Sequence, residues 1–239
     1  MKYEIDFIGT KENKGNADAI CFRYKKNGKF INVVYDGGSK GLVSELTEHL
    51  KKYYFENKSN PKIIDYLICS HPDQDHASGI IEIINNFQIG KIIMNIPWNY
   101  INDIWEYIDD RRITEDSLIK RLKKNYPYVN EIETLANQKN IEILEGFENT
   151  IINENLKILS PSKDFFLELL IESNKTPLEK SKPQSSFLES VINKIKETWD
   201  KDSLKEDIKT SVENEMSIIL LGDMEEEHKF LLTGDAGIR

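Results

Sequence analysis

The sequence predicts a mixed α/β fold in which helices lie on a parallel or mixed β-sheet. An opening series of strand-like segments is joined by tight turns. Apolar strand-like segments then alternate with amphipathic helical segments, and two further strands close the sequence. With 239 residues, the chain is long enough to bury a sizeable core. We therefore expect one domain spanning residues 1–239.

The first strands form an antiparallel meander. Residues 3–9 and 18–24 alternate or cluster apolar side chains in the way that strands do. Asn27 and Gly28 then separate two strand-like segments, and Asn-Gly is the strongest short-range signal of a β-hairpin.

Helices and buried strands follow in alternation. Residues 42–56 carry apolar side chains at helical spacing, and residues 62–70 form a continuous apolar run typical of a strand buried on both faces. Residues 77–88 return to helical spacing, and residues 91–97 form another apolar strand. This order predicts parallel strands with helices packed on the sheet.

The second half of the sequence is less regular. Residues 98–126 have a helical pattern, and residues 137–162 contain short strands separated by turns. Residues 163–213 are rich in Lys, Glu and Ser and contain amphipathic stretches, so we interpret them as a helical insertion within the domain. Residues 216–237 contain two strands joined by an acidic turn, which predicts a closing hairpin.

Composition narrows the classes of function. A net charge of -9 argues against a broad basic surface for nucleic acid. No apolar run reaches the roughly 20 residues that span a bilayer, and the N-terminus reads as a strand rather than a signal peptide. Cys21 and Cys69 lie in apolar stretches and form no CxxC pair. We therefore expect buried free thiols, which suit a reducing compartment. We expect a soluble, cytoplasmic protein without a membrane partner.

The stretch ICSHPDQDHASG places four polar side chains of metal-binding type between a buried strand and a helix. They are His71, Asp73, Asp75 and His76. Loops at the carboxyl ends of strands are where open α/β sheets bind ligands. Residues two apart on an extended turn point to the same side, so the first three side chains converge. Imidazole with carboxylate suits Zn, Mn or Fe(II) better than a soft metal, which prefers thiolates.

An alternative interpretation is that the two histidines pack and the aspartates cap a helix, a position that Asp prefers. Carboxylates gathered this tightly would repel one another without a cation. Asp235, at the tip of the last strand, is predicted to complete the site, although Gly-Asp is also common in plain turns. A metal at such a site can activate a water molecule for hydrolysis.

The pattern H71-P-D73-Q-D75-H76 resembles the signature HxHxDH of the metallo-β-lactamase fold superfamily, whose members also carry a later strand ending in a metal-bridging Asp. With Asp at its second ligand position, it is most similar to the HxDxDH variant of ComEC-type competence domains. The segments KGNADAICF, VVYDGG, NEMSIILL and FLLTGDAG agree in order with that family. Residues 163–213 lie outside the resemblance.

The resemblance implies a four-layer αβ/βα sandwich with the active site at one edge. It assigns His71 and Asp73 to a first metal, Asp75 and His76 to a second, and Asp235 to a bridging position. Asp75 would also orient or deprotonate the attacking water, as the catalytic residue. The implied cofactor is a divalent metal, Zn or Mn, with one or two ions bound.

The sequence departs from the family in two ways. Most members add a His from a middle strand and another some tens of residues after the bridging Asp, often in HHGS. Only His49 and His228 remain here, in a predicted helix and an acidic turn, and we interpret both as ordinary solvated residues. Because the sequence stops at Arg239, we expect an apparently truncated sandwich that is part of a longer chain or a multi-protein assembly.

The leading hypothesis is a hydrolase that cleaves a phosphodiester in a nucleic acid or nucleotide. Lysine-rich residues 120–124 and 175–182 would line a groove for such a substrate, or else form solvated helix faces. Two alternatives stay open. One is a degenerate, non-catalytic module that serves as an interaction part of a larger complex, and the other is a hydrolase of small esters or lactones.

Overall fold

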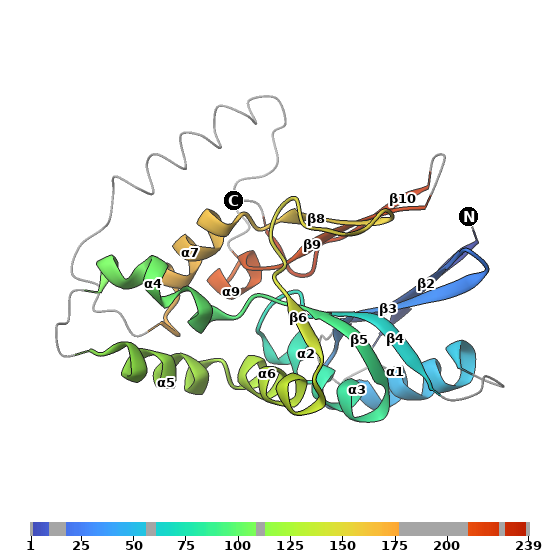
Figure 1. The fold of residues 1–239 in the computed structure, drawn as a ribbon, viewed down its shortest axis with the longest axis horizontal. Helices are drawn as coiled ribbons and strands as arrows, with labels where there is room; N and C mark the ends of the chain where they lie inside the picture. The colour runs from blue at the N-terminus through green and yellow to red at the C-terminus, as the bar shows by residue number, and fades with distance from the viewer. Residues whose placement is uncertain are drawn as a thin grey trace.

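The computed structural model describes residues 2–9, 18–55, 61–108, 113–176, 210–224 and 228–237. Two β-sheets lie face to face, and helices cover the outer face of the larger sheet (Figure 1). Further helices lie beside one end of the smaller sheet, and this arrangement is the predicted α/β sandwich. In these described ranges no helix is both long and apolar enough to cross a membrane.

The larger sheet begins with the predicted antiparallel meander and continues with parallel strands. Its strands follow the chain order: β1 (Tyr3–Ile8), β2 (Ala19–Lys26), β3 (Lys29–Gly37), β4 (Ile63–Ile68), β5 (Gln88–Ile93) and β6 (Glu142–Leu144). Pairing is antiparallel from β1 to β3 and parallel from β3 to β6. Asn27 and Gly28 form the turn between β2 and β3 with φ of 48° and 81°, which confirms the predicted hairpin.

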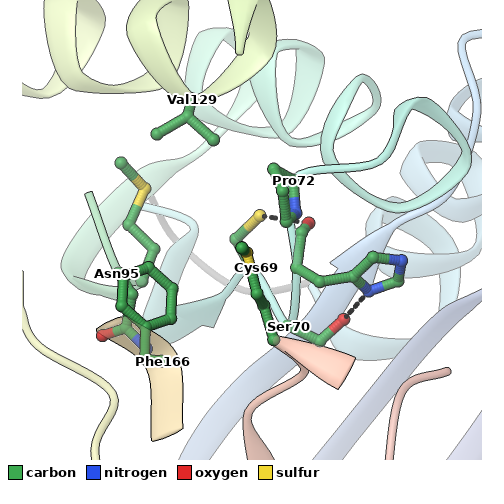
Figure 2. A pocket seen from close by; sticks show the side chains of 9 residues that line it. Cys69, Ser70, Pro72, Asn95, Val129 and Phe166 are labelled. Carbon is green, nitrogen blue, oxygen red and sulfur yellow. Dashed lines mark hydrogen bonds between the residues drawn. The ribbon is translucent and has the colours of Figure 1, made fainter. Parts of the chain in front are cut away.

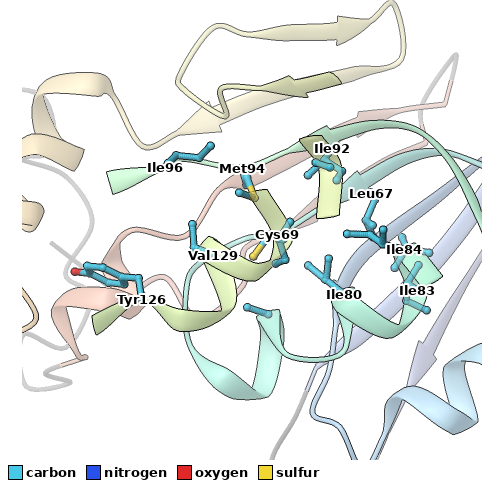
Figure 3. Close-up of a cluster of buried hydrophobic side chains, with 14 of the residues drawn as sticks. Leu67, Cys69, Ile80, Ile83, Ile84, Ile92, Met94, Ile96, Tyr126 and Val129 are labelled. Carbon is cyan, nitrogen blue, oxygen red and sulfur yellow. The ribbon is translucent and has the colours of Figure 1, made fainter. Parts of the chain in front are cut away.

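Several helices lie on the outer side of this sheet. They are α1 (Val43–His49), the π-helix η1 (Leu50–Tyr54), α2 (Gln74–Ala77), α3 (Ile80–Asn86), α5 (Glu115–Asn125) and α6 (Pro127–Lys139), and α5 packs against α6. Leu67 of β4 and Ile92 of β5 belong to the same buried cluster as Ile80 and Ile83 of α3 (Figure 3). Burying these branched side chains holds the start of α3 firmly against the ends of β3 and β4.

The predicted helical range 98–126 is divided into pieces. It contains η2 (Pro97–Tyr100), α4 (Ile101–Ile104) and η3 (Trp105–Tyr107), and it ends with α5. A new helix begins at α5 because Thr114 and Ser117 form a capping box, which satisfies the first free backbone N–H groups. Residues 109–112 lie outside the described ranges.

The smaller sheet is antiparallel and has the order β10-β9-β8-β7. Its strands are β7 (Ile151–Asn153), β8 (Leu156–Ser160), β9 (Ile219–Asp223) and β10 (Lys229–Leu232). Between the two sheets lies a second apolar cluster, in which Phe22 and Tyr35 of the larger sheet meet Ile158 and Leu220 of the smaller one. The predicted closing hairpin is therefore present, while its acidic turn at residues 225–227 lies outside the described ranges.

The predicted insertion is described only at its two ends. These are α7 (Lys163–Glu172) and α9 (Val212–Glu215), whereas residues 177–209 lie outside the described ranges. Phe166 and Leu169 of α7 belong to the outer core cluster. The first helix of this range is therefore part of the packed domain. The two cysteines are free and buried, as predicted.

Candidate metal centre

Asp36 is the buried anchor of the site. It is the next-to-last residue of β3, with a φ of 62°, and its side chain has no exposed surface. Its carboxylate accepts two hydrogen bonds from Ser70, from the backbone N at 2.7 Å and from Oγ at 2.6 Å. Because β3 and β4 are parallel neighbours, Asp36 and the loop after β4 meet at the same sheet edge.

His76 is held by Asp36. It lies in the short helix α2, and its Nδ1 is 2.9 Å from Asp36 Oδ2. Burial lowers the pKa of His76, but the hydrogen bond and negative charge of Asp36, together with Asp235, outweigh burial and raise it to about 9. The other ring nitrogen, Nε2, lies 3.5 Å from Asp235 Oδ1. His76 thus lies between the carboxylates of Asp36 and Asp235, one at each of its ring nitrogens.

His71 presents a free nitrogen lone pair to the same place. Since Ser70 Oγ donates its proton to Asp36, it must accept from His71 Nδ1, which lies 2.9 Å away. The proton is thereby assigned to Nδ1, and Nε2 is left as an acceptor. Nε2 is buried and makes no hydrogen bond with any residue that the structure describes.

The surroundings keep His71 neutral and close to His76. Burial lowers the pKa of His71, and His76 lowers it further, against the opposing charge of Asp36. The centroids of the two imidazole rings are 4.1 Å apart. Ser217, which precedes β9, supports the ring from the opposite sheet, with its Oγ 3.3 Å from Nδ1. A neutral imidazole fixed through Nδ1 is the state in which histidine binds metals.

Two further carboxylates face His76. Asp235 follows β10, and its backbone N donates to Ser217 Oγ at 3.2 Å. Asp18 immediately precedes β2, and burial followed by the charges of Asp235 and Asp36 raises its pKa, against the effect of His76. One ligand atom from each of Asp18, His76 and Asp235 lies within 4.8 Å of the others. The same is true of Asp36, His71 and His76, so His76 belongs to both groups.

Asp73 and Asp75 lie outside both of these groups. Asp73 is at the N-cap position of α2, where its side chain caps nothing, and its Oδ1 accepts a hydrogen bond from Lys175 Nζ at 2.8 Å. Asp75 lies in the first turn of α2, half-buried, and its charge acts on His76 and Asp18. Of the five predicted site residues, the structure therefore gathers His71, His76 and Asp235 at one place.

Sequence reasoning missed Asp18 and Asp36 as site residues. The stretch VVYDGG indicates that a strand ends at Asp36, but it carries no signal of the contact with His76. The prediction that His49 is an ordinary solvated residue is wrong, since only 23% of its side chain is exposed and its Nε2 lies 3.2 Å from Asp6 Oδ2. His228 is exposed, as predicted.

A small pocket adjoins the site (Figure 2). Its wall combines the loops after β4 and β5 with side chains of α6 and α7 and with the residue that follows α9. Most of the lining is apolar: Cys69, Ser70, His71, Pro72, Met94, Asn95, Val129, Phe166 and Met216. His71 therefore stands between a polar cluster and an apolar recess.

The model of the metallo-beta-lactamase superfamily matches residues 31–152, which is half of the chain. This match includes the loop with both histidines. The protein belongs to the metallo-β-lactamase superfamily, whose members are typically hydrolytic metalloenzymes that bind divalent metals. The ligand atoms of Asp18, His76 and Asp235 fit such a metal, and so does the buried Nε2 of His71, which makes no hydrogen bond within the described ranges. No curated protein matches the chain.

Three solved structures are similar to this chain. One is a Thermotoga maritima protein assigned to the metallo-beta-lactamases, with 13% identity, a TM-score of 0.36 and 66% of this chain covered. The mono-zinc form of the metallo-beta-lactamase FIM-1 from Pseudomonas aeruginosa has 13% identity, a TM-score of 0.32 and the same coverage. The hydrolase AbOPH has 14% identity, a TM-score of 0.33 and 62% coverage. The chain spans 65%, 54% and 49% of these proteins, respectively.

Proposed function

We propose that this protein is a metal-dependent hydrolase that cleaves a phosphodiester in a nucleic acid or nucleotide. The observation that carries the proposal is the buried lone pair of His71 Nε2, which lacks a partner among the described residues. It stands beside His76, whose own Nε2 faces Asp235. Leaving a buried acceptor without a partner costs about 1 to 3 kcal/mol, and a bound cation removes that cost.

In this proposal the side chains divide into ligands and supports. His71, His76, Asp18 and Asp235 hold the metal, Zn or Mn, with one or two ions bound. Asp36 and Ser70 orient the two imidazoles through Nδ1, as outer partners of metal-binding histidines do. The metal, when bound, lowers the pKa of a water molecule enough to supply hydroxide near neutral pH. Asp75, half-buried in the first turn of α2, accepts the proton of the attacking water.

Lys175 supports the assignment to a phosphate substrate. Its ammonium group lies at the rim of the site, 37% exposed, and is paired with Asp73. A cation at this position can attract a phosphodiester and hold its charge. The HxDxDH pattern, with its resemblance to ComEC-type domains, points to the same substrate class. The lysines of α5 do not support a substrate groove in the same way. Lys123 is paired with Glu133 at 3.0 Å, and its neighbours Lys120 and Lys124 are exposed, as on a solvated helix face.

Two other functions each have an observation in their favour. The ion pair of Asp73 with Lys175 occupies a carboxylate that the resemblance assigns to a metal, which favours a non-catalytic module in a larger assembly. The apolar pocket beside His71, lined by Met94, Val129 and Phe166, favours a hydrolase of small esters or lactones.

The experiment compares metal content and activity in the same preparations. The purified chain, stripped and then reloaded with Mn or Zn, is assayed with a phosphodiester, a phosphomonoester, an aryl ester and a lactone. A phosphodiesterase should bind one or two ions and cleave the diester fastest. The variant His71→Ala should lose metal, whereas Asp75→Ala should keep at least one ion and lose at least 100-fold in rate.

His228→Ala is the matched control, because this histidine is exposed on the opposite end of the second sheet's hairpin and should affect neither property. Preferred cleavage of the ester or lactone would replace the phosphodiester assignment. If the reloaded chain binds one ion or none and shows no turnover that depends on Asp75, the protein is a non-catalytic module.

A further inference from the structure

We propose that Asp6, Cys21 and His49 form a second metal site, suited to a zinc-like divalent ion. The site lies on the helix-covered face of the larger sheet, where α1 and η1 cross β1 and β2. It shares no residue with the centre around His71 and His76, and its role is independent of the proposed hydrolytic function.

The sheet and the helix bring the three side chains together. Asp6 of β1 and Cys21 of β2 are directly opposite each other in the antiparallel pairing, so their side chains share one face. His49, the last residue of α1, covers them from above. A carboxylate oxygen, the thiol sulfur and a ring nitrogen of these residues all lie within 4.8 Å of one another. Three ligand types thus converge from three separate elements.

The orientation of His49 points to a missing partner. Its Nε2 is buried and makes no hydrogen bond within the described part of the chain, although Asp6 Oδ2 is only 3.2 Å away. The two atoms approach each other outside the geometry that a hydrogen bond needs. Atoms that share a cation are arranged in this way, since each directs a lone pair at the ion rather than at the other atom.

Tyr54 supplies the outer support that metal ligands usually have. Its hydroxyl lies 2.8 Å from Asp6 Oδ2 and 3.1 Å from the backbone O of Cys21, so its one proton is available to the Asp6 carboxylate, the nearer acceptor, beside the strand that carries Cys21. The nearest guanidinium, that of Arg23, lies over the Tyr54 ring, and its Nε is paired with Glu4 at 2.5 Å. This neighbouring positive charge is therefore already balanced outside the cluster.

The set of donors selects the ion. One thiolate, one imidazole and one carboxylate suit Zn and its spectroscopic substitute Co(II), whereas Mg and Ca prefer oxygen ligands alone. Three protein ligands leave a fourth position for water. The thiol is fully buried, but Asp6 and His49 are 35% and 23% exposed, so an ion can enter from the solvent side. Once bound, the ion would fasten the edge strand β1 to α1.

Cobalt absorption tests this site separately from the other centre. A thiolate bound to Co(II) gives a charge-transfer band in the near ultraviolet, and no cysteine is among the ligands proposed around His71. The metal-free chain titrated with Co(II) should develop a saturable band, which zinc removes. Cys21→Ser should abolish the band, while Cys69→Ser, the matched change at the other buried cysteine, should retain it.

If Cys21→Ser does not fold, two variants at partly exposed ligands still test the site. His49→Gln and Asp6→Asn should weaken cobalt binding at least tenfold, as judged from the same band. His76→Ala should leave the band unchanged, which separates this site from the hydrolytic centre. The proposal is overturned if the wild-type chain gives no thiolate band, if the band survives in Cys21→Ser, or if both His49→Gln and Asp6→Asn bind cobalt like the wild type.

Discussion

Lys175 Nζ lies 2.8 Å from Asp73 Oδ1, and this ion pair joins two segments that are 102 residues apart in the chain. The ammonium group also lies over the ring of Tyr126, 5.5 Å from its centroid. Asp73 is the residue that the family resemblance assigns to a first metal. If Asp73 binds a further ion, as the resemblance implies, Lys175 competes with that ion for the carboxylate.

Replacing this lysine should strengthen metal binding. In Lys175→Met the repulsion between the ammonium and an incoming cation disappears, an interaction of about 1 to 4 kcal/mol for charges about 4 Å apart. We expect the weaker of the metal-binding steps to tighten about tenfold or more, measured by calorimetric titration with Mn. Lys163→Met is the control, because Lys163 likewise pairs with a carboxylate, Asp103 at 3.1 Å, and lies over an aromatic ring. Equal affinities in the two variants would refute the competition.

Asp36 should govern metal affinity without binding the metal itself. Asp36→Asn keeps the shape of the side chain but removes the charge that holds His76 and Ser70. Loss of such an outer partner typically weakens metal binding 10- to 100-fold. Equilibrium dialysis with Zn measures the change. Asp65→Asn is the matched control, since Asp65 also accepts a backbone hydrogen bond, from Asn32 at 2.8 Å, on the neighbouring strand. A similar loss in both variants would indicate general destabilisation.

The close contact between the end of β3 and the start of α3 should tolerate no side chain. A Cβ on Gly79 would lie 2.0 Å from the carbonyl O of Gly37. We expect Gly79→Ala to lower the free energy of unfolding by about 3 kcal/mol, measured by urea denaturation of the metal-free chain. At Gly41 the nearest atom to an added Cβ is 3.7 Å away, so Gly41→Ala should change stability by less than about 1 kcal/mol. Equal effects would show that this contact relaxes freely.

Tyr126 should make stability depend on pH at the alkaline end. Burial is the main influence that raises the pKa of Tyr126 to about 12, while tyrosine in the unfolded chain ionises near pH 10. Its stabilising effect is thus fully present below pH 10 and is lost as the pH rises through 12. Between these values the wild type should lose up to about 3 kcal/mol more than Tyr126→Phe. Parallel losses in the two proteins, followed by urea unfolding at each pH, would contradict the shift.

Local sequence patterns predict the strands and the broad architecture well. The Asn27–Gly28 turn, the buried strand that becomes β4 and the closing hairpin each depend on neighbours in sequence, and all are confirmed. The helical range 98–126 is predicted less well. Its helical periodicity continues without a break, but the capping box at Thr114 begins a separate helix within it.

Contacts across the sandwich escape prediction. The sequence singles out His71 and His76 because they lie within six residues, and the roles of all five predicted ligands remain predictions. Asp36 is different, since its importance arises from the parallel pairing of β3 with β4, which only the folded sheet specifies. The contact of Lys175 with Asp73 and that of His49 with Asp6 likewise depend on where helices settle on distant strands.

Ser217 and Asp235, which flank strands of the smaller sheet, contact His71 and His76 respectively, whereas Ser70 and Asp36 contact them from the larger sheet. An ion bound by these groups would connect the two sheets through its ligands. The affinity for this ion is then thermodynamically linked to the free energy of unfolding, to which the apolar cluster between the sheets contributes. Truncating Ile158 or Leu220 of that cluster to alanine will therefore weaken metal binding, and saturating metal will raise the melting temperature of the protein.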